Sequence, residues 1–141
     1  MSPVLSLRAD AAHLASVRRF VEDACRPVLL EPANDARVAA LVLAVHEAAA
    51  NVAEHAYRGA GGALRLAAEW AGPTLVVRLW HDGEPVDRAA VPPPRFDGAA
   101  ERGFGTFLLE GAADRVLYES RDGRHAVRIE KTFLLNEGDE R

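Results

Sequence analysis

The sequence predicts an α+β fold, a two-layer sandwich in which three helices cover one face of a mostly antiparallel sheet. The expected order of elements is β-α-α-β-β-loop-α-β-β, so helices and strands do not alternate one for one as a doubly wound parallel sheet requires. Two pairs of predicted strands are each joined by a short turn, one containing Gly72-Pro73 and the other Asp122-Gly123. Such turns are typical of antiparallel hairpins.

The composition fits a single globular domain, since 49% of the 141 residues are hydrophobic and 27% are charged. We expect this domain to span residues 1–135 and a flexible polar tail to follow over 136–141. The net charge of −4, with no run of basic residues, disfavours direct binding to nucleic acid. No signal-peptide pattern and no apolar run near the roughly 20 residues of a membrane span is present. We therefore expect a cytoplasmic protein with no membrane partner.

The N-terminal part of the chain predicts a strand and then a helix. Val4–Arg8 alternates apolar and polar residues, as a half-buried strand does. Asp10 is predicted to cap a helix over residues 11–26, which the prolines after it would end.

A second, longer helix is predicted over residues 34–58, which contain no Gly or Pro and are rich in Ala, Leu and Glu. Asn34 or Asp35 offers a capping side chain at its start, and Gly59 is suited to end it. At about 100° per residue, one face of this helix is apolar. The residues of that face are Val38, Leu41, Val45, Ala49, Val52 and Ala56.

The remaining elements follow from alternation and from turn residues. Strands are predicted over 63–70, 74–80, 115–120 and 125–134, a Pro-rich loop over 81–98, and a third helix from Glu101 to Asp114.

Three polar residues of the long helix, Glu47, Asn51 and His55, follow one another at intervals of four and therefore form one ridge. This ridge is either a solvated helix face or a face that meets another element or a ligand. The Ala residues around it favour close approach, and a mid-helix Asn is locally unfavourable. Carboxylate and amide oxygens also suit Mg²⁺ and the acceptance of a proton.

Two further segments have the chemistry of a binding site. Gly103-x-Gly105-Thr106 opens the third predicted helix, where free backbone N–H groups favour phosphate, although a plain loop-to-helix junction has the same pattern. His81-Asp82-Gly83 follows an apolar strand. It is either only a turn or a place where a carboxylate accepts a hydrogen bond from a base amine such as that of adenine.

Four motifs in this order resemble the GHKL, or histidine-kinase-type, ATPase fold with its Bergerat-type site. They are Glu47-x-x-x-Asn51-x-x-x-His55-Ala56-Tyr57, the turn at Asp82-Gly83, the Pro-rich segment and Arg102-Gly103-x-Gly105. Within that fold the sequence resembles the anti-sigma-factor serine kinases. The resemblance covers nearly the whole chain. It implies ATP and Mg²⁺ as cofactors.

The resemblance also implies roles for individual residues. Asn51 would coordinate Mg²⁺, and Glu47 would be the general base that accepts the proton of a Ser or Thr hydroxyl. The residues implied to contact the nucleotide are Asn51, His55, His81, Asp82, Gly83, Arg102, Gly103, Gly105 and Thr106.

One position departs from the family pattern. The family has an adenine-reading Asp two residues before the Gly of its D-x-G turn, and that position here is His81, with Asp82 one residue late. A shift of one residue along a strand turns a side chain to the opposite face. Three outcomes are open: a bulge re-aims Asp82, His81 reads the base less well, or nucleotide binding is weakened.

The resemblance implies two protein partners, a STAS-type anti-anti-sigma protein as the phosphorylated substrate and a sigma factor, with a homodimer as the usual assembly. The function predicted is that of an ATP-dependent serine/threonine protein kinase. The alternative is a non-catalytic module of the same fold that sequesters its partner and binds ATP weakly or not at all.

Overall fold

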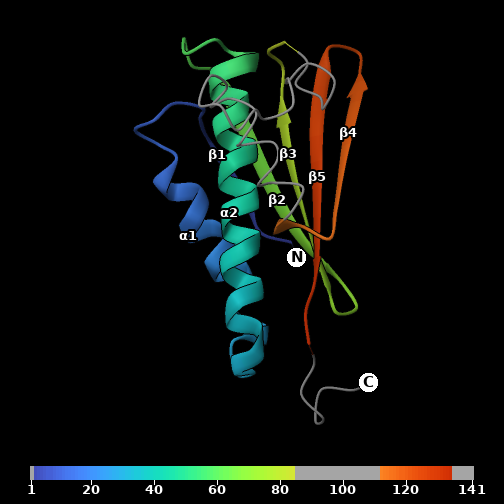
Figure 1. The fold of residues 1–141 in the computed structure, drawn as a ribbon. Coiled ribbons are helices and arrows are strands. Elements are labelled where there is room, and N and C mark those ends of the chain that lie inside the picture. The colour runs from blue at the N-terminus through green and yellow to red at the C-terminus, as the bar shows by residue number, and fades with distance from the viewer. Residues whose placement is uncertain (1, 85–111, 135–141) are drawn as a thin grey trace, which may run out of the picture.

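The computed structural model describes residues 2–84 and 112–134, and Figure 1 shows their path. Three predicted segments fall largely or wholly outside these residues: the Pro-rich loop from residue 85 on, the third helix up to residue 111, and the polar tail over 136–141.

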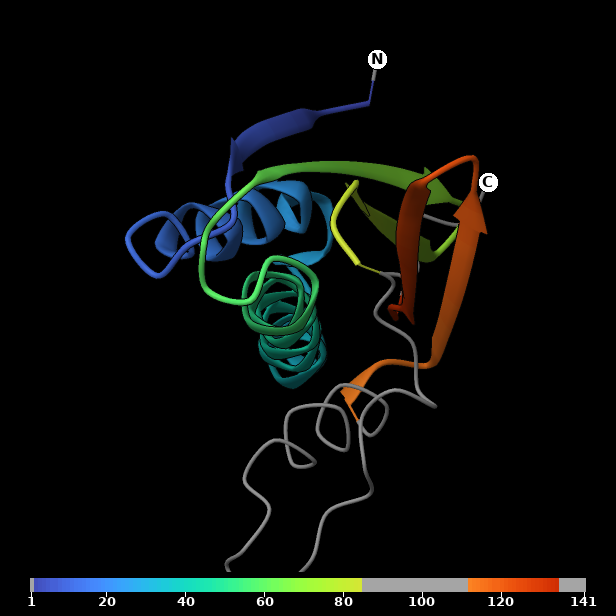
Figure 2. The same ribbon diagram turned by 90° about the horizontal axis from the view of Figure 1, so that it is seen from above.

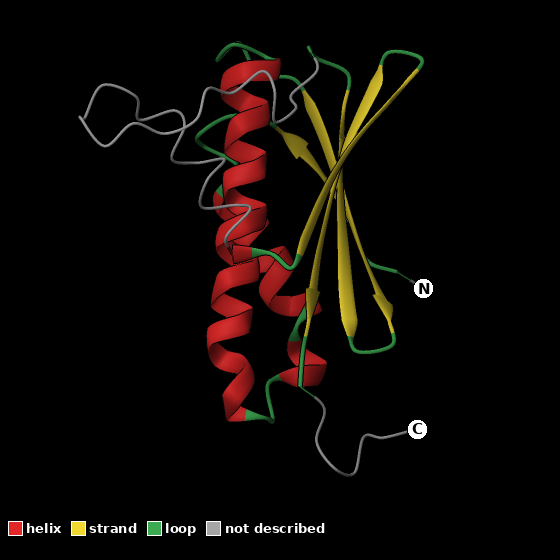
Figure 3. Ribbon diagram, turned by 45° about the vertical axis from the view of Figure 1, so that its right-hand side comes forward, coloured by secondary structure: helices red, strands yellow, loops and turns green. Residues whose placement is uncertain are grey.

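A single five-stranded sheet forms one layer, and all of its neighbouring strands are antiparallel. Figures 2 and 3 show that the helices lie together on one side of it. This arrangement confirms the predicted α+β sandwich, with two α-helices in the described residues. The strands, in the spatial order β1-β2-β3-β5-β4, are β1 (Val4–Arg8), β2 (Ala63–Ala71), β3 (Thr74–His81), β5 (Arg124–Thr132) and β4 (Arg115–Arg121).

The first helix, α1 (Ala15–Ala24), is shorter than the predicted span of 11–26. Asp10 does accept a hydrogen bond from the backbone N–H of His13 at 3.1 Å, as the predicted cap should. The backbone bonds that follow it, however, join residues three apart, including Ser16 N–H to the His13 carbonyl at 3.1 Å. These tighter turns delay the regular helix by one turn. A 3₁₀ turn, Arg26–Val28, follows the helix at its other end.

The second helix, α2 (Asp35–Asn51), continues into a π-helical turn, Val52–Ala56, which the sequence pattern did not predict. The Tyr57 N–H donates to the Val52 carbonyl at 3.0 Å, a bond between residues five apart. Gly59 then adopts φ +79°, in agreement with its predicted place at the end of the helix. π-Turns are rare and occur frequently at functional sites.

The core lies between the two layers. Buried apolar residues of α2 meet those of the central strands, including Leu66 on β2, Val77 and Leu79 on β3 and Ile129 on β5. Residues 32–56 are long and apolar enough to cross a membrane by length and composition, but this segment is the helix that covers the sheet and packs against it. Its apolarity is explained by that packing.

Asn34 was expected to cap α2, but its side chain makes no capping hydrogen bond. The residue is fully buried. Its side-chain N–H₂ donates to the carbonyl oxygens of Val28 at 3.2 Å and Leu134 at 2.8 Å, and its Oδ1 accepts from the Leu134 N–H at 2.8 Å. Asn34 thus ties the segment between the helices to the residues after β5.

We predict that Asn34→Ala lowers the free energy of unfolding by about 1–3 kcal/mol, because it leaves the buried Val28 carbonyl and the partly buried backbone groups of Leu134 without their partner. Urea unfolding measures the change. The exposed neighbour Asp35 provides the control, since Asp35→Ala should cost less than about 1 kcal/mol. Equal losses in the two variants would show that the buried amide does not join these segments.

Candidate functional site

Glu47 and Asn51 lie one turn apart on the last regular turns of α2, as the ridge predicts. Only 6% of the Asn51 surface is exposed, and Glu47 is half-buried. This side of the helix is therefore not a solvated face. An amide buried to this degree is either hydrogen-bonded within the protein or placed to bind something that enters with it.

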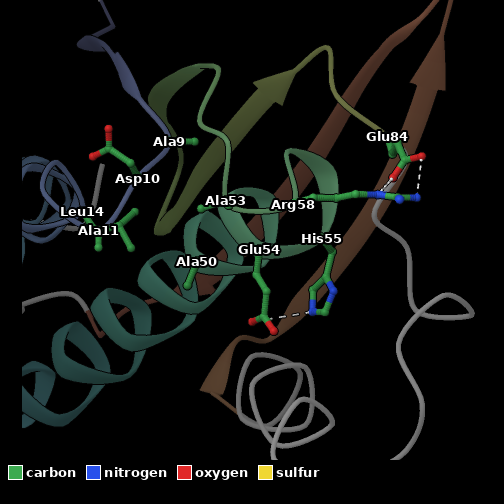
Figure 4. A pocket seen from close by; sticks show the side chains of 11 residues that line it. Ala9, Asp10, Ala11, Leu14, Ala50, Ala53, Glu54, His55, Arg58 and Glu84 are labelled. Atoms are coloured by element: carbon green, nitrogen blue, oxygen red, sulfur yellow. Dashed lines mark hydrogen bonds and ion pairs between the residues drawn. The ribbon is translucent and has the colours of Figure 1, made fainter.

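His55, the third residue of the ridge, belongs to the π-turn. A π-turn has more residues per turn than an α-helix, so His55 is offset from the line that Glu47 and Asn51 define. Its Nε2 lies 3.9 Å from the Glu54 carboxylate, too far for a hydrogen bond. Figure 4 shows both side chains at the rim of one cavity.

This cavity, of about 1010 Å³, lies between the loop before α1 and the C-terminal end of α2. At its rim the Arg58 guanidinium forms two bonds to the Glu84 carboxylate, at 2.7 and 2.9 Å. Neither Glu47 nor Asn51 lines it, so only His55 of the predicted ridge belongs to this cavity. Its lining residues are Ala9, Asp10, Ala11, Leu14, Ala50, Ala53, Glu54, His55, Arg58, Gly59 and Glu84.

The turn after β3 is held against the end of α2. The Glu84 N–H donates to the Ala56 carbonyl at 2.9 Å. A side chain at Gly83 would place its Cβ 2.6 Å from the same carbonyl oxygen, so this contact requires a glycine. The Gly of the predicted nucleotide turn is therefore needed for packing, whatever else it contacts.

Tyr57 connects the same two segments. Its hydroxyl oxygen lies 2.8 Å from the Asp82 carboxylate and 2.6 Å from the Ala63 carbonyl, and it accepts the Asp82 N–H at 3.2 Å. Burial raises the pKa of the Tyr57 phenol, so the hydroxyl stays protonated and can donate its one proton to the Asp82 carboxylate or to the Ala63 carbonyl. Asp82 is exposed and its carboxylate is directed to this tyrosine.

His81 is the last residue of β3 and pairs with Leu64 on one side and His125 on the other. The pairing is continuous to the strand end, so the bulge considered for Asp82 does not occur. Leu75, Val77, Leu79 and His81 alternate along the face that the helices cover, and His81 is 4% exposed. His81, not Asp82, therefore occupies the inward position that the family pattern gives to an Asp.

Two aromatic rings lie against the ring of His81. Tyr57 meets it edge-on with ring centroids 6.1 Å apart, and His125 lies at 5.2 Å. In the described part of the chain neither ring nitrogen of His81 has a hydrogen-bond partner. Burial, and then the proximity of His125, lower the pKa of His81 to about 4, so the ring is neutral near pH 7.

The other predicted contacts, Arg102, Gly103, Gly105 and Thr106, lie outside the described residues and remain predictions.

The sequence pattern of the histidine kinase-like ATPase domain family matches residues 7–131, which is most of the chain. The chain belongs to this family. A search of curated proteins gives no match. Membership places this histidine kinase-like ATPase domain among ATP-binding domains with a GHKL-type fold, and the five-stranded sheet covered by helices agrees with that fold.

The described residues of the ATPase domain fit a nucleotide with Mg²⁺ in two respects. Asn51 presents a buried amide beside the half-buried carboxylate of Glu47, a donor set that suits Mg²⁺. His81 has buried ring nitrogens without partners, which a purine could satisfy. Asp82 does not fit the role of base reader, because its carboxylate is bonded to Tyr57.

Sequence reasoning included Tyr57 only as the end of the helix motif, and it did not find His125 as part of this region. The contact of Tyr57 with Asp82 carries no local sequence signal, because it depends on how the helix end and the strand end meet. His125 lies opposite His81 only because β3 pairs with β5. The side chain of His125 is in turn engaged, with its Nδ1 2.7 Å from the Ser120 hydroxyl.

The depressed pKa of His81 predicts an acid-labile fold. In the unfolded chain a histidine titrates near pH 6.5, so between about pH 4 and 6.5 the unfolded state binds more protons than the native state. Stability therefore falls as the pH falls through this window. We expect the wild type to lose about 2 kcal/mol more than His81→Asn between pH 7 and 4.5.

Urea unfolding of both proteins across this pH range measures the difference. The two proteins are compared by the slope of the free energy of unfolding against pH. A pH-independent cost of the substitution does not affect this slope, and the titration of other groups contributes equally to both proteins. Parallel pH profiles for the two proteins would contradict a buried, neutral His81.

Proposed function

We propose that this domain is an ATP- and Mg²⁺-binding regulator of the anti-sigma-factor type, a serine/threonine protein kinase whose substrate is a STAS-type anti-anti-sigma protein. A sigma factor is its proposed second partner, and the proposed setting is the cytoplasm, with a homodimer as the working assembly. Membership of the histidine kinase-like ATPase family supports the nucleotide, and the resemblance of the motifs supports the partners.

The observation that carries the proposal is the pair Glu47 and Asn51. The two side chains stand one turn apart at the end of α2, and Asn51 is 94% buried while Glu47 keeps partial access to solvent. A carboxylate beside a buried amide allows cation binding and proton acceptance to fall to different side chains. The amide oxygen holds a cation, and the carboxylate remains free to accept a proton.

In this proposal the nucleotide supplies the phosphoryl group, with Mg²⁺ neutralising its charge. Asn51 would hold the cation through its amide oxygen, and water would complete the coordination, since Mg²⁺ takes few protein ligands. Glu47 would accept the proton of the incoming Ser or Thr hydroxyl as its oxygen forms a bond to the γ-phosphorus and the bond from that phosphorus to ADP breaks. Positioning and charge neutralisation contribute more to such transfers than covalent catalysis by the protein does.

A second candidate function is a module that sequesters its partner without phosphoryl transfer. The commitment of Asp82 to Tyr57 favours it, because the domain then lacks a carboxylate at the base-reading position. Retention of both Glu47 and Asn51 favours the kinase. Nucleotide binding and phosphoryl transfer therefore need separate tests.

For binding, we predict that calorimetric titration detects ATP only when Mg²⁺ is present. Asn51→Ala should weaken this binding at least tenfold, about 1.4 kcal/mol, because it removes the cation ligand. Asn51→Asp keeps an oxygen at the same position and should retain Mg²⁺-dependent binding. Binding that is independent of both Mg²⁺ and Asn51 would contradict the assignment of the cation site.

For transfer, we predict that Glu47→Gln binds ATP as the wild type does but phosphorylates a STAS-domain substrate about 10²–10⁴-fold more slowly, because the proton acceptor is lost. Mass spectrometry of a panel of STAS-domain proteins incubated with each enzyme measures the rate. Glu119→Gln, an exposed carboxylate change on β4, is the matched control. Wild-type rates for Glu47→Gln would exclude Glu47 as the base, and no transfer by the wild type would favour the sequestering module.

A further inference from the structure

We propose that His81 reads the purine in this domain and that the site accepts 6-oxopurine nucleotides, such as ITP, as readily as ATP. This inference rests on the proposed function, since it concerns the selectivity of the same nucleotide site. It concerns the group at C6 of the purine, which is an amine in ATP and a carbonyl oxygen in ITP.

The position of His81 suits it to contact the purine. It ends β3 on the face that the helices cover, with 4% of its surface exposed. Tyr57 and His125 lie against its ring, and neither ring nitrogen has a hydrogen-bond partner in the described part of the chain. Both nitrogens are buried. Buried polar atoms are seldom left unpaired, so a purine whose C6 group reached this ring would give one of the nitrogens a partner.

The two nearby carboxylates, Asp82 and Glu84, already have hydrogen-bond partners. Asp82 is bonded to the Tyr57 hydroxyl at 2.8 Å, and Glu84 forms a two-bond pair with Arg58. The close contact of Gly83 with the Ala56 carbonyl and the bond from the Glu84 N–H to the same oxygen hold the turn in this conformation. Asp82 could replace His81 only if these contacts broke.

Replacing a carboxylate by an imidazole changes which group at C6 of the purine the side chain can hydrogen-bond. An ionised carboxylate only accepts hydrogen bonds, so it favours a purine with a 6-amino group and disfavours a 6-oxo group. A neutral imidazole has one donor and one acceptor nitrogen, and it can exchange them by changing tautomer. It can therefore accept from the amine of ATP or donate to the oxygen of ITP.

The structure leaves both neutral tautomers of His81 accessible. His81 is neutral near pH 7, because burial lowers its pKa to about 4. No hydrogen bond within the described residues fixes which of its nitrogens carries the proton. The neighbouring His125 directs its Nδ1 to Ser120.

The test is calorimetric titration of ATP and of ITP, with Mg²⁺, into the wild type, His81→Asp and His81→Asn. The quantity compared is the ratio of the two dissociation constants within each protein, so a general loss of stability or affinity cancels. For the wild type we expect ATP and ITP to bind within about threefold of each other, because either C6 group finds a partner.

His81→Asp should raise the preference for ATP at least tenfold, since an acceptor-only side chain opposes the 6-oxo group. His81→Asn retains both a donor and an acceptor and should keep the ratio near that of the wild type. The three proteins together separate the hydrogen-bonding character of the side chain from the loss of the histidine itself.

Strong selection of ATP by the wild type, or an unchanged ratio in His81→Asp, would overturn this inference and leave nucleotide binding intact. Failure of the wild type to bind either nucleotide would overturn both this inference and the proposed function.

Discussion

The contact between the end of α2 and the turn after β3 is the constraint on which the rest of the site depends. The Ala56 carbonyl accepts the Glu84 N–H and leaves no room for a side chain at Gly83, while Tyr57 holds Asp82 and Arg58 holds Glu84. These contacts join the last turn of a helix in one layer to a strand end in the other. They hold together the helix end that carries Asn51 and the strand end that carries His81, the two residues of the proposed nucleotide site.

The same contact explains how a departure from the family pattern is accommodated. Asp82 is one residue away from the position expected of a base-reading carboxylate, and the structure uses it to anchor Tyr57. The inward position is filled by His81, which packs between Tyr57 and His125 and is neutral near pH 7 because its burial depresses its pKa. The change thus replaces a fixed negative charge in the interior with a neutral ring that can donate or accept a hydrogen bond.

Local patterns predicted the sandwich, both hairpins and the position of Gly59, because alternation, turn residues and helix propensity act over a few residues. They also predicted that Glu47 and Asn51 share one side of a helix. The patterns could not predict the π-turn before Tyr57, the tie that Asn34 makes to Leu134, or the meeting of His81 with His125. The last two depend on segments far apart in the chain, and Asn34 shows that such a partner can override a local capping preference.

The most direct test of the account is to follow the side-chain resonances of Asn51 and His81 by NMR during addition of ATP with Mg²⁺. If both residues contact one bound nucleotide, as proposed, the resonances of the Asn51 side-chain amide and the His81 ring will shift together and saturate at the same nucleotide concentration. Resonances of Ala11 and Ala53, which line the cavity between the loop before α1 and the end of α2, should move little. Shifts confined to that cavity, with Asn51 and His81 unchanged, would contradict the placement of the nucleotide site at the junction of α2 and β3.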